Sequence, residues 1–263
     1  MSRSNPTVNN PNPATRWFEW NGENGVVKYY DKETKKSVAV GDNFTFILLD
    51  ELGCVKGWHD ASESGIHSNE VKDTRAETLV VKSFKGGILA EGLYKDIRDR
   101  VAAAGGQFVA NCYIAFRNGE ELVLGSIQFK GAALGSWMEF QKANRSEVYK
   151  KAVQIKGSVE GKKGRIVFKT PIFHLRDISE ETNQEAVALD AALQEYLKGY
   201  FARTRVEQTE KVTQYEDYSQ DTEREPEPEE LHQRQPEPQQ ERRQEPKPQA
   251  TADMEPEDSD IPF

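Results

Sequence analysis

A single dipeptide, Asn118-Gly119, constrains the fold of this chain more than any other feature, because it lies between two runs of apolar and β-branched residues. Asn-Gly is the typical pair of a two-residue type I′ turn, which joins neighbouring antiparallel strands. Such a turn sets Arg117 opposite Glu120 and fixes the pairing of the residues beyond them. Three further pairs then share one apolar face: Ile114 with Val123, Ala110 with Ile127, and Phe108 with Phe129. We therefore expect an antiparallel sheet.

The other face of this hairpin is polar and basic, with one aromatic ring. It would carry Asn111, Tyr113, Arg117, Ser126, Gln128 and Lys130, with Val109 and Leu124 among them. A sheet face of this kind suits nucleic acid, since rings stack on bases and cations contact phosphates. An ordinary solvated face with one tyrosine has the same pattern. The hairpin alone leaves both interpretations open.

Most of the chain before this hairpin consists of short runs rich in aromatic and β-branched residues, separated by Gly, Asn and Asp, which is typical of strands. Strands are expected at Trp17–Trp20, Gly25–Tyr30, Ser37–Val40, Asn43–Leu49, Leu52–His59 and Thr78–Phe84. The polar stretch Asp60–Arg75 is interpreted as a long loop. Helices are expected at Tyr94–Ala104, at Leu134–Asn144, and from a capping box of Thr182 and Glu185 to about Tyr200. The last helix packs on its own domain or mediates a dimer contact.

A second hairpin is predicted from Val153–Glu160 and Arg165–Thr170, joined by the turn Gly161–Gly164. Its tip carries Lys162, Lys163 and Arg165, and Lys156 and Lys169 could line the same side of the strands. We interpret this hairpin as a basic finger that contacts phosphates. The alternative is an exposed loop that only keeps the protein soluble.

The charge of the chain is divided unevenly along its length. The whole chain has 44 acidic and 35 basic residues. Residues 205–263 contain 18 of the acidic and 7 of the basic residues, so residues 1–204 contain 26 acidic and 28 basic residues. A slightly basic body thus precedes an acidic tail rich in Glu, Pro and Gln. Such a tail contains too few apolar residues to offset the entropy of folding, so it is expected to be a disordered tether. The overall negative charge therefore does not exclude nucleic acid as a partner.

The last residues combine acid with a short apolar end: Asp258, Asp260, Ile261, Pro262 and Phe263. Phe263 presents a ring and the terminal carboxylate together, which a basic pocket on another protein can bind. Together with Met254, this end resembles the C-terminal tip of bacterial and phage single-stranded DNA-binding proteins. The alternative is an acidic end that only aids solubility.

The resemblance implies a fold and a function. It implies an OB-fold that holds single-stranded DNA, and a tip that docks replication, recombination and repair proteins. The expected fold class is mainly β, an OB-fold-like antiparallel barrel with extra helices, and the longer body and the Glu/Pro/Gln-rich linker favour a phage-type relative in the bacterial cytoplasm. The expected domains are a disordered segment (1–15), the DNA-binding domain (16–204), a disordered linker (205–253) and the docking tip (254–263).

Single-stranded DNA requires aromatic faces for bases and cations along the backbone. The aromatic candidates are Trp17, Trp20, Tyr29, Trp58, Phe84 and Tyr113. The basic candidates are Lys28, Lys82, Lys85, Arg117, Lys130, Lys156, Lys162, Lys163 and Arg165. Any one aromatic residue is more often core than platform, and the sequence does not say which of them are exposed.

Two other classes of function are compatible with a chain of this composition: an enzyme or zinc protein, and an adaptor. An enzyme or zinc protein would need a recognisable site, and Cys54, His59, His67, Cys112 and His174 lack the usual ligand spacing, so neither catalysis nor a cofactor is expected. The widely spaced cysteines suggest core thiols in a reducing compartment. No apolar run is long enough to span a membrane. The main alternative is an acidic adaptor or inhibitor that binds a replication enzyme without binding DNA.

Overall fold

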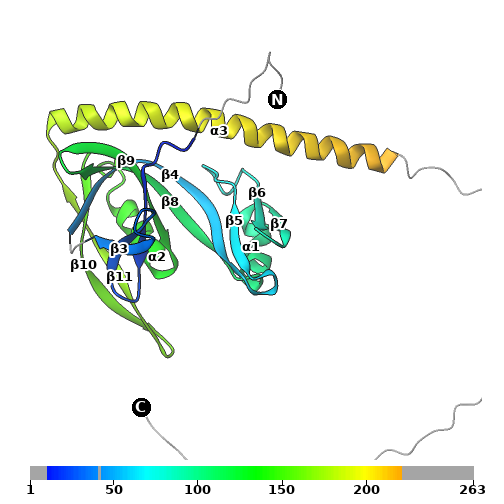
Figure 1. The fold of residues 1–263 in the computed structure, drawn as a ribbon, viewed down its shortest axis with the longest axis horizontal. Helices are drawn as coiled ribbons and strands as arrows, with labels where there is room; N and C mark the ends of the chain where they lie inside the picture. The colour runs from blue at the N-terminus through cyan, green and yellow to red at the C-terminus, as the bar shows by residue number, and fades with distance from the viewer. Residues whose placement is uncertain (1–10, 41–42, 221–263) are drawn as a thin grey trace, which may run out of the picture. The chain divides into compact units, whose positions relative to one another are not determined.

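The structure is a computed structural model and describes residues 11–40 and 43–220. Its strands form one mixed sheet (Figure 1). The strands are β1 (Arg16–Asn21), β2 (Val26–Asp31), β3 (Lys36–Val40), β4 (Asn43–His59), β5 (Ser64–Ser68), β6 (Leu79–Ser83), β7 (Gly87–Gly92), β8 (Gly106–Asn118), β9 (Glu121–Lys130), β10 (Ala152–Lys163) and β11 (Ile166–Arg176). The helices are α1 (Tyr94–Ala103), α2 (Gly131–Ala143) and α3 (Glu180–Gln220), with a short 3₁₀ helix at Asp60–Ser62.

The long strand β4 joins two lobes of this sheet. It pairs with β8 on one side; on its other side its first residues pair with β10 and its last residues with β5. A bulge between Leu48 and Asp50 separates the two parts. The large lobe contains β1, β2, β3, β9, β10, β11 and α2, and the small lobe contains β5, β6, β7 and α1 (Figure 1). The mainly β prediction is confirmed.

The sheet differs from the predicted antiparallel barrel in two respects. β1 runs parallel to β9, so the sheet is mixed. Its order runs from β3 to β7 without returning on itself, so the sheet is open. In the large lobe, β11 does approach the β1–β2 turn, where Lys169 N–H donates to Gly22 O at 2.7 Å and Trp20 Nε1 donates to Lys169 O at 2.8 Å. These two bonds fasten the hairpin without extending a strand ladder.

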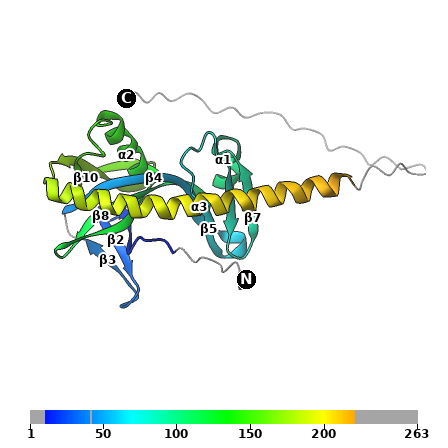
Figure 2. The ribbon, with the colours of Figure 1, turned by 90° about the horizontal axis from the view of Figure 1, so that it is seen from above.

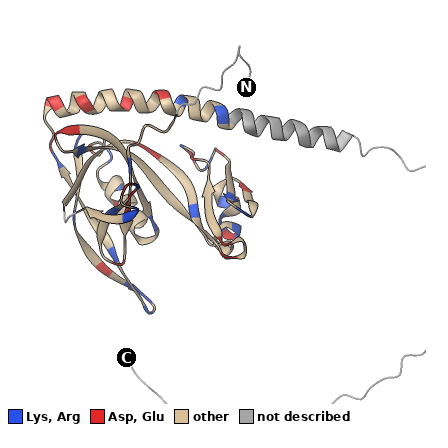
Figure 3. Ribbon diagram, in the orientation of Figure 1, with Lys and Arg blue, Asp and Glu red and all other residues tan. Residues whose placement is uncertain are grey.

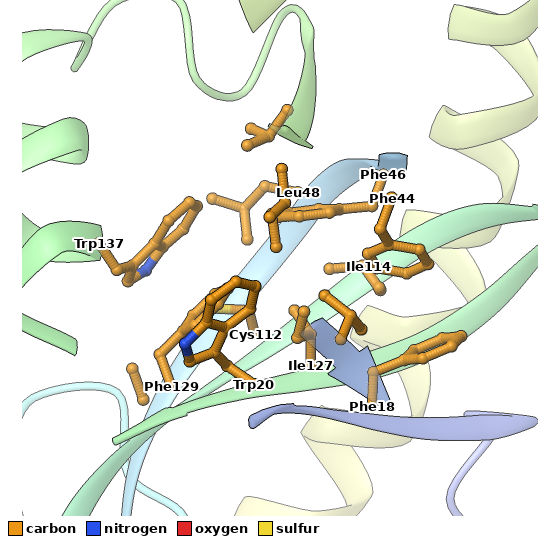
Figure 4. Packing of buried hydrophobic residues seen from close by; sticks show 14 of the residues in the cluster. Phe18, Trp20, Phe44, Phe46, Leu48, Cys112, Ile114, Ile127, Phe129 and Trp137 are labelled. Carbon is orange, nitrogen blue, oxygen red and sulfur yellow. The ribbon is translucent and has the colours of Figure 1, made fainter. Parts of the chain in front are cut away.

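Aromatic side chains fill the core of the large lobe. Phe18, Phe44, Phe46, Phe129 and Trp137 are buried together, and they come from β1, β4, β9 and α2 (Figure 4). Trp137 stacks on Phe129 with ring centroids 5.1 Å apart. The predicted apolar face of the β8–β9 hairpin lies in this core, because Ala110, Cys112, Ile114, Phe116, Ile127 and Phe129 all belong to it.

The β8–β9 register differs by two residues from the prediction. Asn118 pairs with Glu121 and Arg117 with Leu122, so the two-residue turn is Gly119-Glu120. Gly119 has φ 68°, which suits the first position of a type II′ turn. Because successive side chains alternate between faces, a shift of two residues keeps each side chain on its predicted face. The β10–β11 turn is likewise displaced, to Gly164-Arg165, because Lys163 pairs with Ile166.

The predicted long loop Asp60–Arg75 contains a strand. β5 lies between β4 and β6, and Lys56, His67 and Lys82 are paired across the three strands. Its Ser, Gly and His residues have little strand propensity of their own. The strand therefore forms because both neighbours offer backbone hydrogen bonds, a tertiary effect that overrides local preference.

Helix α3 lies along both lobes (Figures 1 and 2). Its Leu193 and Leu197 are buried against Leu52, Tyr113 and Leu124 of the sheet. The N-cap is Ser179, whose Oγ accepts from Thr182 N–H at 3.2 Å, so the predicted capping box of Thr182 and Glu185 is wrong by one turn. The helix runs past Thr204 into the predicted linker, and 221–263 lie outside the described residues.

Replacing Leu193 with alanine tests how far α3 stabilises the fold. The substitution leaves a cavity between the helix and the sheet, so it is expected to lower the free energy of unfolding by about 2–5 kcal/mol. Val187 is an exposed residue on the same helix, and Val187→Ala should change it by less than about 0.5 kcal/mol. Urea denaturation measures both. Equal effects of the two substitutions would contradict the packing of α3.

Candidate nucleic-acid interface

The small lobe has one covered and one open sheet face. Val55, Ile66 and Val81 point to one side and are buried against Ile97 and Val101 of α1. Because side chains alternate along a strand, the residues between them point to the opposite side. That side carries Lys56 and Trp58 of β4, Gly65 and His67 of β5, and Lys82 and Phe84 at the end of β6. We call this set the β4–β6 face.

Register arranges the β4–β6 face in two rows. Lys56 pairs with His67 and His67 with Lys82, which makes a basic row. Trp58 pairs with Gly65, and Phe84 N–H donates to Gly65 O at 3.1 Å, which makes an aromatic row. Residues two apart on a strand are about 6.6 Å apart along it, so the rows are immediate neighbours. The fold therefore places cations beside rings.

The rings of this face are open to solvent. Trp58 is 56% exposed and Phe84 is 75% exposed. Phe84 stacks on His67 with ring centroids 4.4 Å apart and planes inclined by 22°. It also lies over Gly65, where an added Cβ would be 3.2 Å from Phe84 Cε2. Glycine at this position therefore leaves room for the ring to lie across β5.

A set of hydroxyl groups holds the end of β6 that carries Phe84 and Lys85. Ser62 Oγ is 2.9 Å from Ser64 Oγ and donates to Ser83 Oγ at 3.2 Å. Ser83 Oγ accepts from Gly86 N–H at 2.8 Å, and Ser64 Oγ accepts from Lys85 N–H at 3.2 Å. These bonds tie the β6–β7 turn to the β4–β5 turn. The backbone on either side of Phe84 is thus held by hydrogen bonds within the protein.

The charge of the face comes from Lys56 and Lys82, and Lys85 follows Phe84 in the neighbouring β6–β7 turn. Lys56, Lys82 and Lys85 make no ion pair with another described residue. Burial and, secondarily, the charge of Lys82 lower the pKa of His67, so its ring is neutral near pH 7. His67 therefore contributes a flat surface, and the three lysines contribute the positive charge.

Four of the predicted DNA contacts thus come together: Trp58, Lys82, Phe84 and Lys85. His67 and Gly65 also belong to the site, although the sequence predicts a loop for the stretch that contains them. The signal that could have found them is the alternation of Gly65, His67 and Asn69 with apolar Ile66, which resembles a half-buried strand.

Other predicted contacts lie on β1, β2 and β9, and of these Tyr29 faces the core, opposite Phe18. Lys28 and Lys130 both pair with Glu19, at 3.0 and 3.6 Å. Trp17 is 40% exposed, and Lys32 Nζ lies 4.9 Å from the centre of its ring. Tyr29 is half-buried beneath the Arg16 guanidinium at 4.4 Å. These side chains are engaged within the protein.

Two predicted aromatic contacts have no free face. Trp20 lies in the large-lobe core, and Tyr113 is fully buried. Around Tyr113, the polar side of the β8–β9 hairpin is covered by α3 and by Ala14, so it is not an open platform. We remove Trp20 and Tyr113 from the predicted DNA contacts, because a buried ring cannot stack on a base.

A half-buried glutamate, Glu70, binds the polar residues of this covered face through its carboxylate. Glu70 accepts from Asn111 Nδ2 at 2.7 Å and from Tyr113 Oη at 2.9 Å, and its backbone N–H donates to Tyr200 Oη at 2.7 Å. Ser126 Oγ in turn donates to Asn111 Oδ1 at 2.6 Å. Burial raises the pKa of Glu70, although the hydrogen bonds and Lys56 act in the opposite direction. The polar face serves the fold.

The remaining basic candidates lie in the large lobe. Arg117 pairs with Glu185 of α3 at 3.2 Å, so it fastens the helix. Lys156, Lys162, Lys163 and Arg165 are exposed on the β10–β11 hairpin, and the last three are at its tip (Figure 3). None of these four makes an ion pair with another described residue. The hairpin is therefore a second basic element. The predicted docking tip, 254–263, lies outside the described residues.

Within 11–40 and 43–220, no three His, Cys, Asp or Glu side chains gather in a way that could hold a metal ion. No helix in the same ranges is long and apolar enough to cross a membrane. No protein-family model, curated protein or solved structure matches the chain.

The raised pKa of Glu70 predicts a pH dependence of stability. Because the folded protein binds this proton more readily than the unfolded chain, whose glutamate pKa is about 4.3, the stabilising effect of protonation is complete below that pH. It is lost as pH rises through the folded-state pKa. The free energy of unfolding of the native protein minus that of Glu70→Gln should therefore fall as pH rises from about 4.3 through the folded-state pKa. Urea denaturation across this range tests it.

The control is Glu91→Gln, which changes an exposed glutamate of β7. Its difference from the native protein should stay constant over the same range of pH. A Glu70→Gln difference that is flat, or that rises with pH, would contradict the buried state of this carboxyl group.

Proposed function

We propose that this chain is a non-catalytic single-stranded DNA-binding protein that coats exposed strands with little regard to sequence. The observation that carries the proposal is the β4–β6 face, where an aromatic row lies beside a basic row. Stacking on an aromatic ring is available to every base, and a lysine contacts the phosphate common to every nucleotide. Such a surface binds the repeating parts of a strand rather than its base edges.

The β10–β11 hairpin extends the proposed contact. Lys162, Lys163 and Arg165 lie at its tip without ion pairs among the described residues, so their charge is available to phosphates. Within the proposal, the large lobe corresponds to the OB-fold that the resemblance implies, and the small lobe is an addition. The terminal residues Asp258 to Phe263 would recruit replication, recombination and repair proteins.

One observation favours a second candidate, an adaptor that binds a replication enzyme and no DNA. Lys28, Lys130 and Arg117 are each paired with a glutamate of the chain, so part of the basic character of the body is neutralised internally. An adaptor would use the acidic tail and would leave the β4–β6 face without a ligand. Titration with oligo-dT distinguishes the two candidates.

Removing the exposed rings should weaken oligonucleotide binding. Trp58→Ala and Phe84→Ala each delete one stacking surface, which is worth about 1–3 kcal/mol per base, so the Kd for oligo-dT should rise roughly 5- to 150-fold. Fluorescence anisotropy with a labelled oligonucleotide measures this change in low salt.

The matched control is Tyr30→Ala, because Tyr30 is 61% exposed on β2 in the other lobe. It should leave the Kd unchanged within about twofold, as expected of a surface substitution away from the site. If the native protein does not bind oligo-dT, the proposed function is wrong. If Tyr30→Ala weakens binding as much as Trp58→Ala, the assignment of the β4–β6 face is wrong.

The two lysines of the face, together with Lys85 in the adjacent β6–β7 turn, should govern the salt dependence of binding. Each phosphate contact on a single strand contributes about 0.7 to the slope of log K against log salt. Replacing Lys56, Lys82 and Lys85 with glutamine should therefore make the slope shallower by about 2. A triple glutamine variant at Lys35, Lys36 and Lys95, which are exposed elsewhere, should keep the native slope. Equal slopes in the two triple variants would count against the face.

A further inference from the structure

A cleft of about 600 Å³ lies between α2 and the β4–β8 pair, on the opposite side of β4 from Trp58. Glu51 and Gly53 of β4 and Phe108 of β8 line it on the sheet side, and Met138 of α2 and Tyr149 line it on the other. Its size is that of a small-molecule site. None of its lining residues belongs to the β4–β6 face.

Glu51 is a hydrogen-bond acceptor held in a fixed position. Its Oε2 accepts from Trp137 Nε1 and from Gln141 Nε2, both at 2.7 Å, and the weak donor Cys112 Sγ lies 3.6 Å away. Its Oε1 accepts no hydrogen bond from any described residue. This oxygen is not one of the buried side-chain atoms without a hydrogen-bond partner, so it is accessible to solvent. The cleft therefore contains a carboxylate oxygen that is oriented, accessible and free to accept a hydrogen bond.

The surroundings of Glu51 combine flat apolar surface with positive charge. Tyr149 is 55% exposed and Met138 is 58% exposed. Phe108 lies over Gly53, where an added Cβ would be 2.9 Å from Phe108 Cζ, so the missing side chain makes room for this ring. Lys142 and Arg145 line the cleft, and neither pairs with an acid among the described residues.

A ligand for this cleft must supply a flat apolar body, a hydrogen-bond donor and an anion. An acidic peptide has the anion, but its carboxylates would meet Glu51 and Glu139, which also lines the cleft. A nucleotide has all three features. Cytosine, adenine and guanine carry an exocyclic amino group that can donate to a carboxylate. Thymine has none, and its ring N–H lies between two carbonyl oxygens that Glu51 would repel.

We propose that this cleft binds one amino-bearing nucleobase together with its phosphate. Glu51 Oε1 accepts from the amino group, the Tyr149 ring covers the base, and Lys142 and Arg145 contact the phosphate. The base comes either from a free nucleotide or from a bound strand, and only the second source rests on the proposed function. In a strand, the cleft adds a preference for amino-bearing bases to the sequence-independent β4–β6 face.

The experiment compares oligo-dC with oligo-dT of equal length, and free dCMP with free dTMP. The native protein should bind oligo-dC more tightly than oligo-dT by about fivefold to a hundredfold, the discrimination expected of a well-placed base contact. Glu51→Gln should weaken oligo-dC binding without weakening oligo-dT binding, which brings this ratio close to one. Tyr149→Ala should weaken oligo-dC binding more than oligo-dT binding. In the free-nucleotide arm, dCMP should alter Trp137 fluorescence and dTMP should not.

Glu139→Gln is the matched control, since Glu139 is an exposed acid of the same cleft; it should keep the native ratio. Unfolding measurements on Glu51→Gln establish that it remains folded, and Tyr149→Ala tests the same cleft from an exposed position. If the native protein binds oligo-dC and oligo-dT equally, or if Glu51→Gln keeps the native preference for oligo-dC, the inference is wrong. It is also wrong if an acidic peptide competes with oligo-dC for the protein while free dCMP produces no response. If the protein binds oligo-dT and shows no preference among bases, the proposed function is supported and the cleft inference is wrong. A response to dCMP without binding of any oligonucleotide supports the cleft and overturns the proposed function.

Discussion

The pairing of β4 with β8 is the interaction on which the rest of the structure depends. The two strands form a long antiparallel ladder that belongs to both lobes, and the bulge between Leu48 and Asp50 lets β4 change partners from β10 to β5 along its other edge. Because side chains alternate along both strands, one side of the ladder faces α3 and the other faces α2. Each helix therefore buries a different set of residues from the same two strands.

Each side of this ladder encloses a carboxylate, and the two are used differently. On the α3 side, Glu70 accepts hydrogen bonds from Asn111 and Tyr113 at both oxygens, and burial raises its pKa. On the α2 side, Trp137 and Gln141 bind one oxygen of Glu51 and leave the other free. A buried carboxylate with both oxygens satisfied fixes structure, whereas one with an accessible oxygen can recognise a ligand.

Helix α3 covers part of one sheet surface and leaves the rest of that surface accessible to a ligand. It covers Leu52 and Tyr113 through Leu193 and Leu197, and the same side of β4 then continues to Lys56 and Trp58. Cys54 is still buried, whereas Trp58 is 56% exposed, so the cover ends between them. The proposed DNA face is thus the part of a continuous sheet surface that remains open. The rings of Trp58 and Phe84 do not take part in core packing, because the apolar residues of the small lobe pack on the other side of the sheet, against α1.

The sequence alone predicts a mainly β fold, most of the strand positions and the apolar side of the β8–β9 hairpin, because period-two alternation survives an error of two residues in register. It also singled out Trp58, Lys82, Phe84 and Lys85, although it grouped them with Trp20 and Tyr113. The tertiary structure was needed to tell which rings are exposed, because α3 covers Tyr113 and leaves Trp58 open to solvent. It alone formed β5, whose residues have weak strand propensity and are ordered by hydrogen bonds from β4 and β6. The physical reason is the same in both cases: burial and strand pairing depend on segments distant in the chain, which local patterns do not encode.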